Sequence, residues 1–272
     1  MPELQWLTYY LLLGLFVGYF SGLLGIGGGL IMVPVLTFLF EAQHLPSQNI
    51  LHLALGTSMA TILFTSFSST RQHHAHRAVH WDMVRFITPG ILLGTALGAL
   101  IVGYISIYYL TIFFILFVYF AATQMLLGAK PDATRGYPAR AEATVAGMLI
   151  GAISSMVSIG GGVLSVPYLV WHKLPLRNAI ATSSALGIPI AFGGTLGYIA
   201  TGALQGESLP AYSLGYVSLP VLLGLLVGTM VTAPLGAKAT HRLPVNRLKK
   251  IFALVLFALA TKMLLKLITN HV

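Results

Sequence analysis

The sequence contains no cysteine and very little charge. Without cysteine the chain has no disulfides, no thiolate nucleophile and no cysteine-ligated metal. Charged residues make up 8% of the 272 residues, against about 25% in an ordinary soluble domain. Paired carboxylates at depth, which many enzymes need, are also missing, so we expect neither an enzyme nor a cofactor or metal centre. The six acidic residues all fall in predicted loops or at span ends: Glu3, Glu41, Asp82, Asp132, Glu142 and Glu207.

The sequence is instead rich in long apolar stretches. The chain is 57% hydrophobic, with a mean hydropathy of +0.86. Residues 91–129 carry no charge at all and are long enough for two membrane spans of about 20 residues each. The N-terminus has no basic segment before its apolar run, so the first hydrophobic segment is expected to be retained structure rather than a signal peptide. The composition predicts an all-α polytopic membrane protein with the lipid bilayer as a partner.

The net charge of +9 raises the alternative of nucleic-acid binding, but the basic residues are distributed as in a membrane protein. Thirteen of the fifteen lysines and arginines fall in four short segments, 71–85, 130–140, 173–177 and 238–250. The positive-inside rule makes these the cytoplasmic loops. We therefore predict a multi-pass protein of the cell (inner) membrane with its basic loops in the cytoplasm, and no nucleic-acid partner.

One motif occurs twice. The segment GIGGGLIMVP at 25–34 is answered by SIGGGVLSVP at 158–167, an offset of 133 (158 minus 25). Other landmarks recur in the same order, including LPSQN at 45–49 with LPLRN at 174–178, and ATQMLL with ATKMLL. The chain therefore reads as an internal duplication, with repeat 1 at 1–128, a cytoplasmic linker at 129–140 and repeat 2 at 141–272.

The loop charges predict that the two repeats have inverted topology. The basic segment 70–85 corresponds to 203–213, which has no lysine or arginine. The connection 41–49, which also has no lysine or arginine, corresponds to the basic 172–178. Inversion requires an odd number of elements per repeat, and we expect about five. The first two are joined by the glycine break, and their second arms, 30–40 and 163–172, span only about 15 Å as helix. The other predicted spans are 50–69, 82–104 and 107–128, then 178–203, 214–235 and 246–268.

The glycine breaks carry the first candidate site. A chain that re-enters a helix leaves backbone N–H groups without intrahelical partners at a positive dipole end. Glycines allow that backbone to approach a ligand, and consecutive N–H groups form a concavity suited to an anion. Broken helices in matching positions of inverted halves also indicate a transporter's substrate site. The alternative is close helix packing by small residues. The candidate residues are Gly25, Gly27, Gly28, Gly29, Ser158, Gly160, Gly161 and Gly162.

Hydroxyl groups follow each break and could donate hydrogen bonds to an anion without carrying charge. The candidates are Thr57, Ser58, Thr182, Ser183 and Ser184, and the alternative for each is a bond to its own helix backbone. His52, early in a span, is the candidate for proton coupling, and an interfacial position is its alternative. The histidine-rich stretch 71–82 is expected to be a solvated loop rather than a metal site.

The doubled GIGGG and SIGGG motifs, each followed by VP and then by a Thr-Ser span, resemble the TauE/SafE family of sulfite exporter-like permeases, and the resemblance covers essentially the whole chain. It implies secondary transport of small sulfur-containing or organic anions, such as sulfite or sulfonates, with export as the expected direction. The leading hypothesis is alternating access around a mid-membrane site between the two breaks. A passive anion channel is the alternative. A homodimer could form through small-residue faces such as Gly90, Gly94 and Gly98.

Overall fold

The computed structural model describes residues 4–45, 49–127, 136–204, 209–240, 242 and 245–269. Over these ranges the chain forms ten helices and one short hairpin. The helices are α1 (Leu4–Leu24), α2 (Gly29–Ala42), α3 (Ile50–Ala75), α4 (Trp81–Tyr104), α5 (Ile107–Leu127), α6 (Arg140–Val157), α7 (Gly162–Trp171), α8 (Leu176–Leu204), α9 (Leu219–Thr240) and α10 (Val245–Thr269). The hairpin strands are β1 (Ser213–Leu214) and β2 (Val217–Ser218).

The all-α polytopic fold predicted from composition is confirmed. Seven of the described helices are long and apolar enough to cross a membrane, while α2 and α7 are shorter apolar helices. With 14 and 10 residues, these two extend about 21 Å and 15 Å. Each one follows a glycine break, so the predicted hairpins of a longer and a shorter arm are present in both halves of the chain.

Two predicted boundaries are wrong. Helix α3 continues to Ala75 rather than ending near 69, so the first part of the histidine-rich stretch is helical. Helix α9 starts at Leu219 rather than 214, because residues 213–218 form the hairpin, which the sequence did not predict. Among the acidic residues considered above, Glu3, Asp132 and Glu207 lie outside the described residues.

Glycines let helices from different halves pack closely. Gly14, Gly18 and Gly22 of α1 lie against the backbone of α9, and a methyl group on Gly22 would stand 2.0 Å from the carbonyl oxygen of Ala233. Gly90, Gly94 and Gly98 of α4 lie against α6 in the same way. The small-residue face considered for a homodimer is therefore occupied by α6 of the same chain. Dimerisation stays a prediction, but it would have to use another surface.

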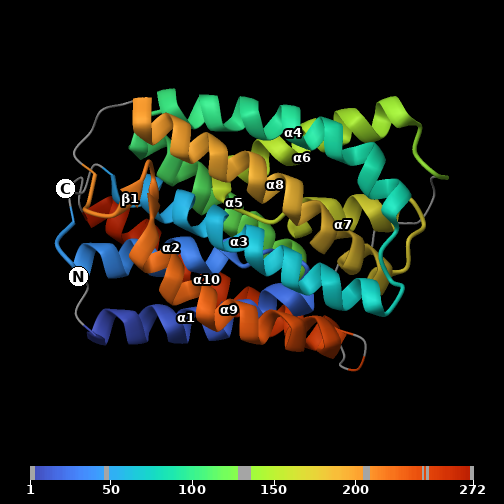
Figure 1. Cartoon of the computed structure of the whole chain (residues 1–272), viewed down its shortest axis with the longest axis horizontal. Coiled ribbons are helices and arrows are strands. Elements are labelled where there is room, and N and C mark those ends of the chain that lie inside the picture. Colours follow the sequence, from blue (N-terminus) through green and yellow to red (C-terminus); the bar gives the residue numbers. More distant parts are fainter. Residues whose placement is uncertain are drawn as a thin grey trace.

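Helices of the first half of the chain pack mainly on helices of the second half, and they do so in corresponding pairs. Helix α1 packs on α9 while its counterpart α6 packs on α4, and the central helices α3 and α8 pack on each other. Figure 1 shows the start of α1, the end of α10 and the hairpin at one end of the bundle, and the starts of α4 and α6 at the other. This pairing is the one that a two-fold relation between the repeats would produce. The inverted membrane orientation itself stays a prediction, as do the boundaries of the repeats and of the linker.

Candidate functional site

The two glycine breaks touch each other in the middle of the molecule. The amide of Gly160 donates a hydrogen bond of 2.9 Å to the carbonyl oxygen of Ile26. A Cβ atom added to Gly27 would lie 2.6 Å from the Cα of Gly160, and one added to Gly160 would lie 2.8 Å from the Cα of Gly27. Both segments are buried. Two segments 133 positions apart in the sequence therefore form one crossing, which we call the glycine crossing (residues 25–29 and 158–162).

The backbone of the crossing requires its glycines at the helix starts. Gly28 caps α2 with φ 82° and Gly161 caps α7 with φ 84°, both in the left-handed region that disfavours a side chain. Neither helix start has a side-chain cap hydrogen bond. Ser158 adopts φ 49° without being a glycine, and its hydroxyl donates a 2.6 Å hydrogen bond to the carbonyl oxygen of Leu55. The starts of α2 and α7 thus present uncapped positive ends at the crossing.

In this conformation the crossing is closed. A Cβ on Gly29 would stand 1.6 Å from the carbonyl oxygen of Ser158, and one on Gly162 would stand 2.3 Å from that of Gly25. No ligand fits between backbones that do not admit a methyl group, and the amide of Gly160 is already bonded. An anion at this site would lie beside the contact, or would enter after the two arms separate.

Ser58 is a candidate hydroxyl on α3, the helix that packs against the glycine crossing through Leu55 and Ile62. It is fully buried, and its Oγ has no hydrogen-bond partner in the structure. It shares a face of α3 with Leu55, whose carbonyl accepts from Ser158, and with Ile62, which lies against Gly27 and Gly29. A buried hydroxyl without a partner is unusual in a protein and needs a reason.

Ser183, the counterpart of Ser58 in the second half, is fully bonded. Its hydroxyl donates to the carbonyl oxygen of Gly25 at 3.1 Å and lies 2.9 Å from the Oγ of Ser165 on α7. Sequence reasoning missed Ser165, although a serine in an otherwise apolar arm, where the first copy has Met32, was a usable signal. Ser184 bonds the carbonyl of Ile180 in its own helix at 3.2 Å, as the alternative interpretation of these hydroxyls anticipated.

The two threonines of the Thr-Ser spans have matching structural contacts. Thr57 Oγ1 accepts a 3.0 Å hydrogen bond from the backbone amide of Ser218, directly before α9. Thr182 Oγ1 accepts a 3.0 Å hydrogen bond from the amide of His80, directly before α4. Each threonine therefore anchors the entry to a helix of the other half. As acceptors in these bonds, both hydroxyls keep their own proton for donation.

The histidines are less exposed than expected. His52 is 8% exposed, and its ring stacks on Tyr216 of the hairpin turn with the ring centroids 5.0 Å apart, so a surface position is wrong, while its role in proton coupling stays a prediction. His73 is fully buried, with Nε2 3.3 Å from the carbonyl oxygen of Gly22, so the solvated-loop expectation is wrong for this part of 71–82. Within the part of the chain that the structure describes, no three metal-ligating side chains gather as a metal site would require.

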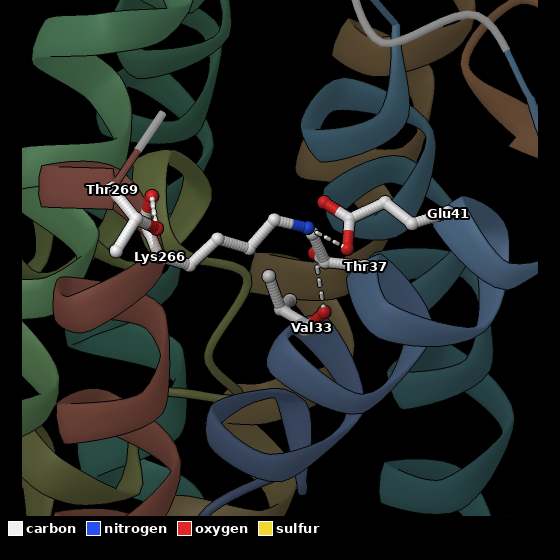
Figure 2. Close-up of polar contacts among 5 residues, drawn as sticks. All are labelled: Val33, Thr37, Glu41, Lys266 and Thr269. Carbon is white, nitrogen blue, oxygen red and sulfur yellow. Dashed lines mark hydrogen bonds and ion pairs between the residues drawn. The ribbon is translucent and has the colours of Figure 1, made fainter. Parts of the chain in front are cut away.

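The far end of α2 is held by α10. Figure 2 shows Lys266 of α10 reaching across to form an ion pair with Glu41, and Thr37 bonded to the carbonyl of Val33 one turn earlier in α2. Lys262 lies over the ring of Phe38, with Nζ 4.2 Å from the ring centroid, which is a cation–π contact. Both lysines that lie outside the four basic segments therefore contact α2.

The long apolar helices and the paired broken helices define a polytopic α-helical membrane protein of the transporter class. The sequence model of the family described as sulfite exporter TauE/SafE matches residues 10–263, so the chain belongs to this family. A probable membrane transporter protein of Haemophilus influenzae is 37% identical over 257 residues, which cover 94% of this chain and 97% of that protein. A probable membrane transporter protein of Methanocaldococcus jannaschii is 28% identical over 264 residues, which cover 95% of this chain and 96% of that protein. No solved structure matches the chain.

Proposed function

We propose that this protein is a secondary active transporter that exports small sulfur-containing or organic anions, such as sulfite or sulfonates, by alternating access around the glycine crossing. The observation that carries the proposal is Ser58, a fully buried hydroxyl without a hydrogen-bond partner on α3, the helix whose Ile62 packs against Gly27 and Gly29 at the start of α2. An anion at that place would accept from the hydroxyl and from backbone amides at a positive helix end. The family description supports transport and suggests sulfite as the substrate, and the names of the relatives support transport.

Alternating access follows from how the two arms meet. The crossing is closed by backbone contact between Gly27 and Gly160, so moving α2 against α7 would create room for the anion and open a path to one side. The remaining candidate donors, Thr57 and Thr182, lie on the helices that flank these arms. In this arrangement the chain binds and moves its substrate without altering it. It would lie in the cell (inner) membrane with the basic ends of the helices in the cytoplasm.

A passive anion channel of the same architecture is the alternative. The closed backbone contact favours the transporter, because a conducting pore needs a continuous path through the crossing. The two mechanisms differ thermodynamically: a coupled transporter accumulates its substrate against a gradient, and a channel only dissipates the gradient.

The test is anion efflux from proteoliposomes loaded with sulfite, a sulfonate or a small carboxylate. We expect saturable flux, accumulation against a gradient when an ion gradient is supplied, and loss of flux when Gly28 or Gly161 is replaced by valine. Gly136→Val is the matched control, because a Cβ at Gly136 meets no atom within 4 Å. Absence of saturable anion flux, or full flux in the Gly28 and Gly161 variants, would refute the proposal. Flux without accumulation would favour the channel.

A further inference from the structure

The C-terminal end of the short helix α7 is tied to the start of α6 by a histidine and a glutamate. His172 follows the last residue of α7 and is 3% exposed. Its Nδ1 lies 2.7 Å from the carbonyl oxygen of Gly136. Its Nε2 lies 3.6 Å from Oε1 of Glu142 in the first turn of α6. Both nitrogens of one buried ring therefore point at oxygen atoms.

The protons at this ring can be assigned from its partners. A carbonyl oxygen only accepts, so the 2.7 Å contact requires Nδ1 to carry a proton and to donate it. In a neutral imidazole Nε2 is then a bare acceptor, and it faces a carboxylate oxygen, which is also an acceptor. Nε2 is buried and has no hydrogen-bond partner in the structure. The pair has room for one more proton, which would turn an acceptor–acceptor contact into a charge-assisted hydrogen bond.

We propose that His172 and Glu142 form a proton-binding site, and that a bound proton ties α7 to α6 and holds the glycine crossing closed. The proton reaches the site through Glu142, whose side chain is 36% exposed. The tie acts on the crossing because α7 has only 10 residues, starting at Gly162 in the crossing and ending next to His172. A helix this short moves as a rigid rod, so fixing its far end restricts its tilt at the break.

The equivalent end of α2 is held by groups that respond differently to pH. Glu41 pairs with Lys266, and Gln43, which follows α2, donates to the hydroxyl of Tyr10 on α1. A lysine–carboxylate pair and an amide–phenol bond keep their protonation through the neutral range. Histidine is the side chain whose charge ordinarily changes between about pH 5 and 8. Acidification would therefore tighten the α7 end and leave the α2 end unchanged.

The other ionisable groups near this end are two tyrosines and three basic residues. Tyr168 lies edge-on to the His172 ring, with the two ring centroids 4.7 Å apart. The guanidinium carbon of Arg140 lies 5.1 Å from the centroid of the Phe86 ring. Burial and the charge of Asp82 on α4 raise the pKa of Tyr137. Lys173 and Arg177 follow His172 in the chain. Among the described residues, Glu142 is the carboxylate that faces Nε2 of His172. The contact between them stabilises the fold only when a proton lies on Nε2.

A first experiment measures the proton site without any substrate. The melting temperature of the purified protein is recorded from pH 8 to pH 5.5 for wild type, His172→Gln and Glu142→Gln, with the exposed His76→Gln as control. A protonated His172 gains a partner only in the folded protein, so its stabilisation is present at low pH and disappears as pH rises. We expect wild type to exceed His172→Gln most at pH 5.5, and the difference to shrink towards pH 8.

Glu142→Gln keeps the inference testable if His172→Gln folds poorly. The amide of a glutamine at 142 can donate to Nε2 of neutral His172, so the tie should persist at every pH and the pH dependence should vanish. The control variant should behave as wild type. If both the His172 and Glu142 variants retain the wild-type pH dependence of melting, the proton-binding site is refuted.

A second experiment links the site to transport, and only this part rests on the proposed function. With equal pH on both sides of the proteoliposome, the anion flux of wild type should fall from pH 8 to pH 5.5. The flux of His172→Gln should not fall, and that of Glu142→Gln should be low throughout. Unchanged pH profiles in both variants would refute the effect on the crossing. If wild type shows no anion flux while the melting data follow the expectation, the transport proposal fails and the proton site stands.

Discussion

Replacing Ser58 by alanine separates a role in binding from a role in folding. The Ser58 hydroxyl is fully buried and unpaired, so the folded protein already bears the cost of removing it from water. That cost is about 1–3 kcal/mol for a hydroxyl in proteins. Ser58→Ala should therefore leave the melting temperature unchanged or raise it, because the substitution removes one oxygen and creates no unpaired group.

The same substitution should damage anion binding. A hydrogen bond to a charged group contributes about 1.5–3 kcal/mol. Its loss corresponds to about a ten- to hundredfold weaker affinity, with 1.4 kcal/mol per factor of ten. The half-saturating anion concentration for flux should rise by that factor. The matched variant is Ser183→Ala, whose hydroxyl donates to the carbonyl of Gly25 and contacts Ser165, so this variant should melt at a lower temperature.

The assays are thermal unfolding of the purified proteins and initial flux at several anion concentrations in proteoliposomes. The expected pattern is opposite for the two serines: lost affinity with retained stability for Ser58→Ala, and lost stability for Ser183→Ala. A Ser58→Ala protein that is destabilised and transports with unchanged affinity would show that this hydroxyl serves the fold, and the reasoning from its missing partner would be wrong.

Two further predictions concern packing at the crossing and its anchors. Gly29→Ala forces a methyl group against the carbonyl oxygen of Ser158, 1.6 Å away, and should lower the free energy of unfolding by at least the ~1–3 kcal/mol typical of overpacking. The control Gly136→Ala should melt at the wild-type temperature. Equal melting temperatures for the two variants would mean that the crossing readily separates. Thr57→Val leaves the buried amide of Ser218 unpaired and should lower the free energy of unfolding by about 1–3 kcal/mol. Thr57→Ser should retain most of this stability, because its hydroxyl can still accept the hydrogen bond. A Thr57→Val protein as stable as wild type would contradict the anchoring role.

Much of the fold could be predicted because membrane proteins encode it in local sequence. Apolar length predicted the long helices, and the repeated GIGGG and SIGGG segments predicted the breaks that start α2 and α7. The hairpin at 213–218 was missed because its strands have two residues each and carry no alternating pattern. Sequence does not predict the extension of α3 to Ala75, because basic and histidine residues are typical of loops but are also favourable in the last turn of a helix, where His73 and His74 lie.

The candidate site was harder to predict because its members serve different partners. Sequence reasoning grouped Thr57 with Ser58 and Thr182 with Ser183, since adjacent hydroxyls look equivalent in one dimension. On a helix, neighbouring residues point about 100° apart, so the threonines face helix entries of the other half while the Ser58 hydroxyl has no hydrogen-bond partner. Nothing in the sequence indicated that His172 and Glu142 meet, because 30 positions separate them (172 minus 142).

By itself the sequence determined the membrane class, the duplicated breaks and the glycines on which they depend, because hydropathy, charge distribution and left-handed backbone are properties of single residues and short segments. Tertiary structure alone decided that the two breaks touch, that Ser58 lacks a partner while Ser183 has two, and that one short arm ends on a titratable pair and the other on a lysine–glutamate pair. These features depend on how helices distant in the sequence are oriented when they pack, which no local pattern records.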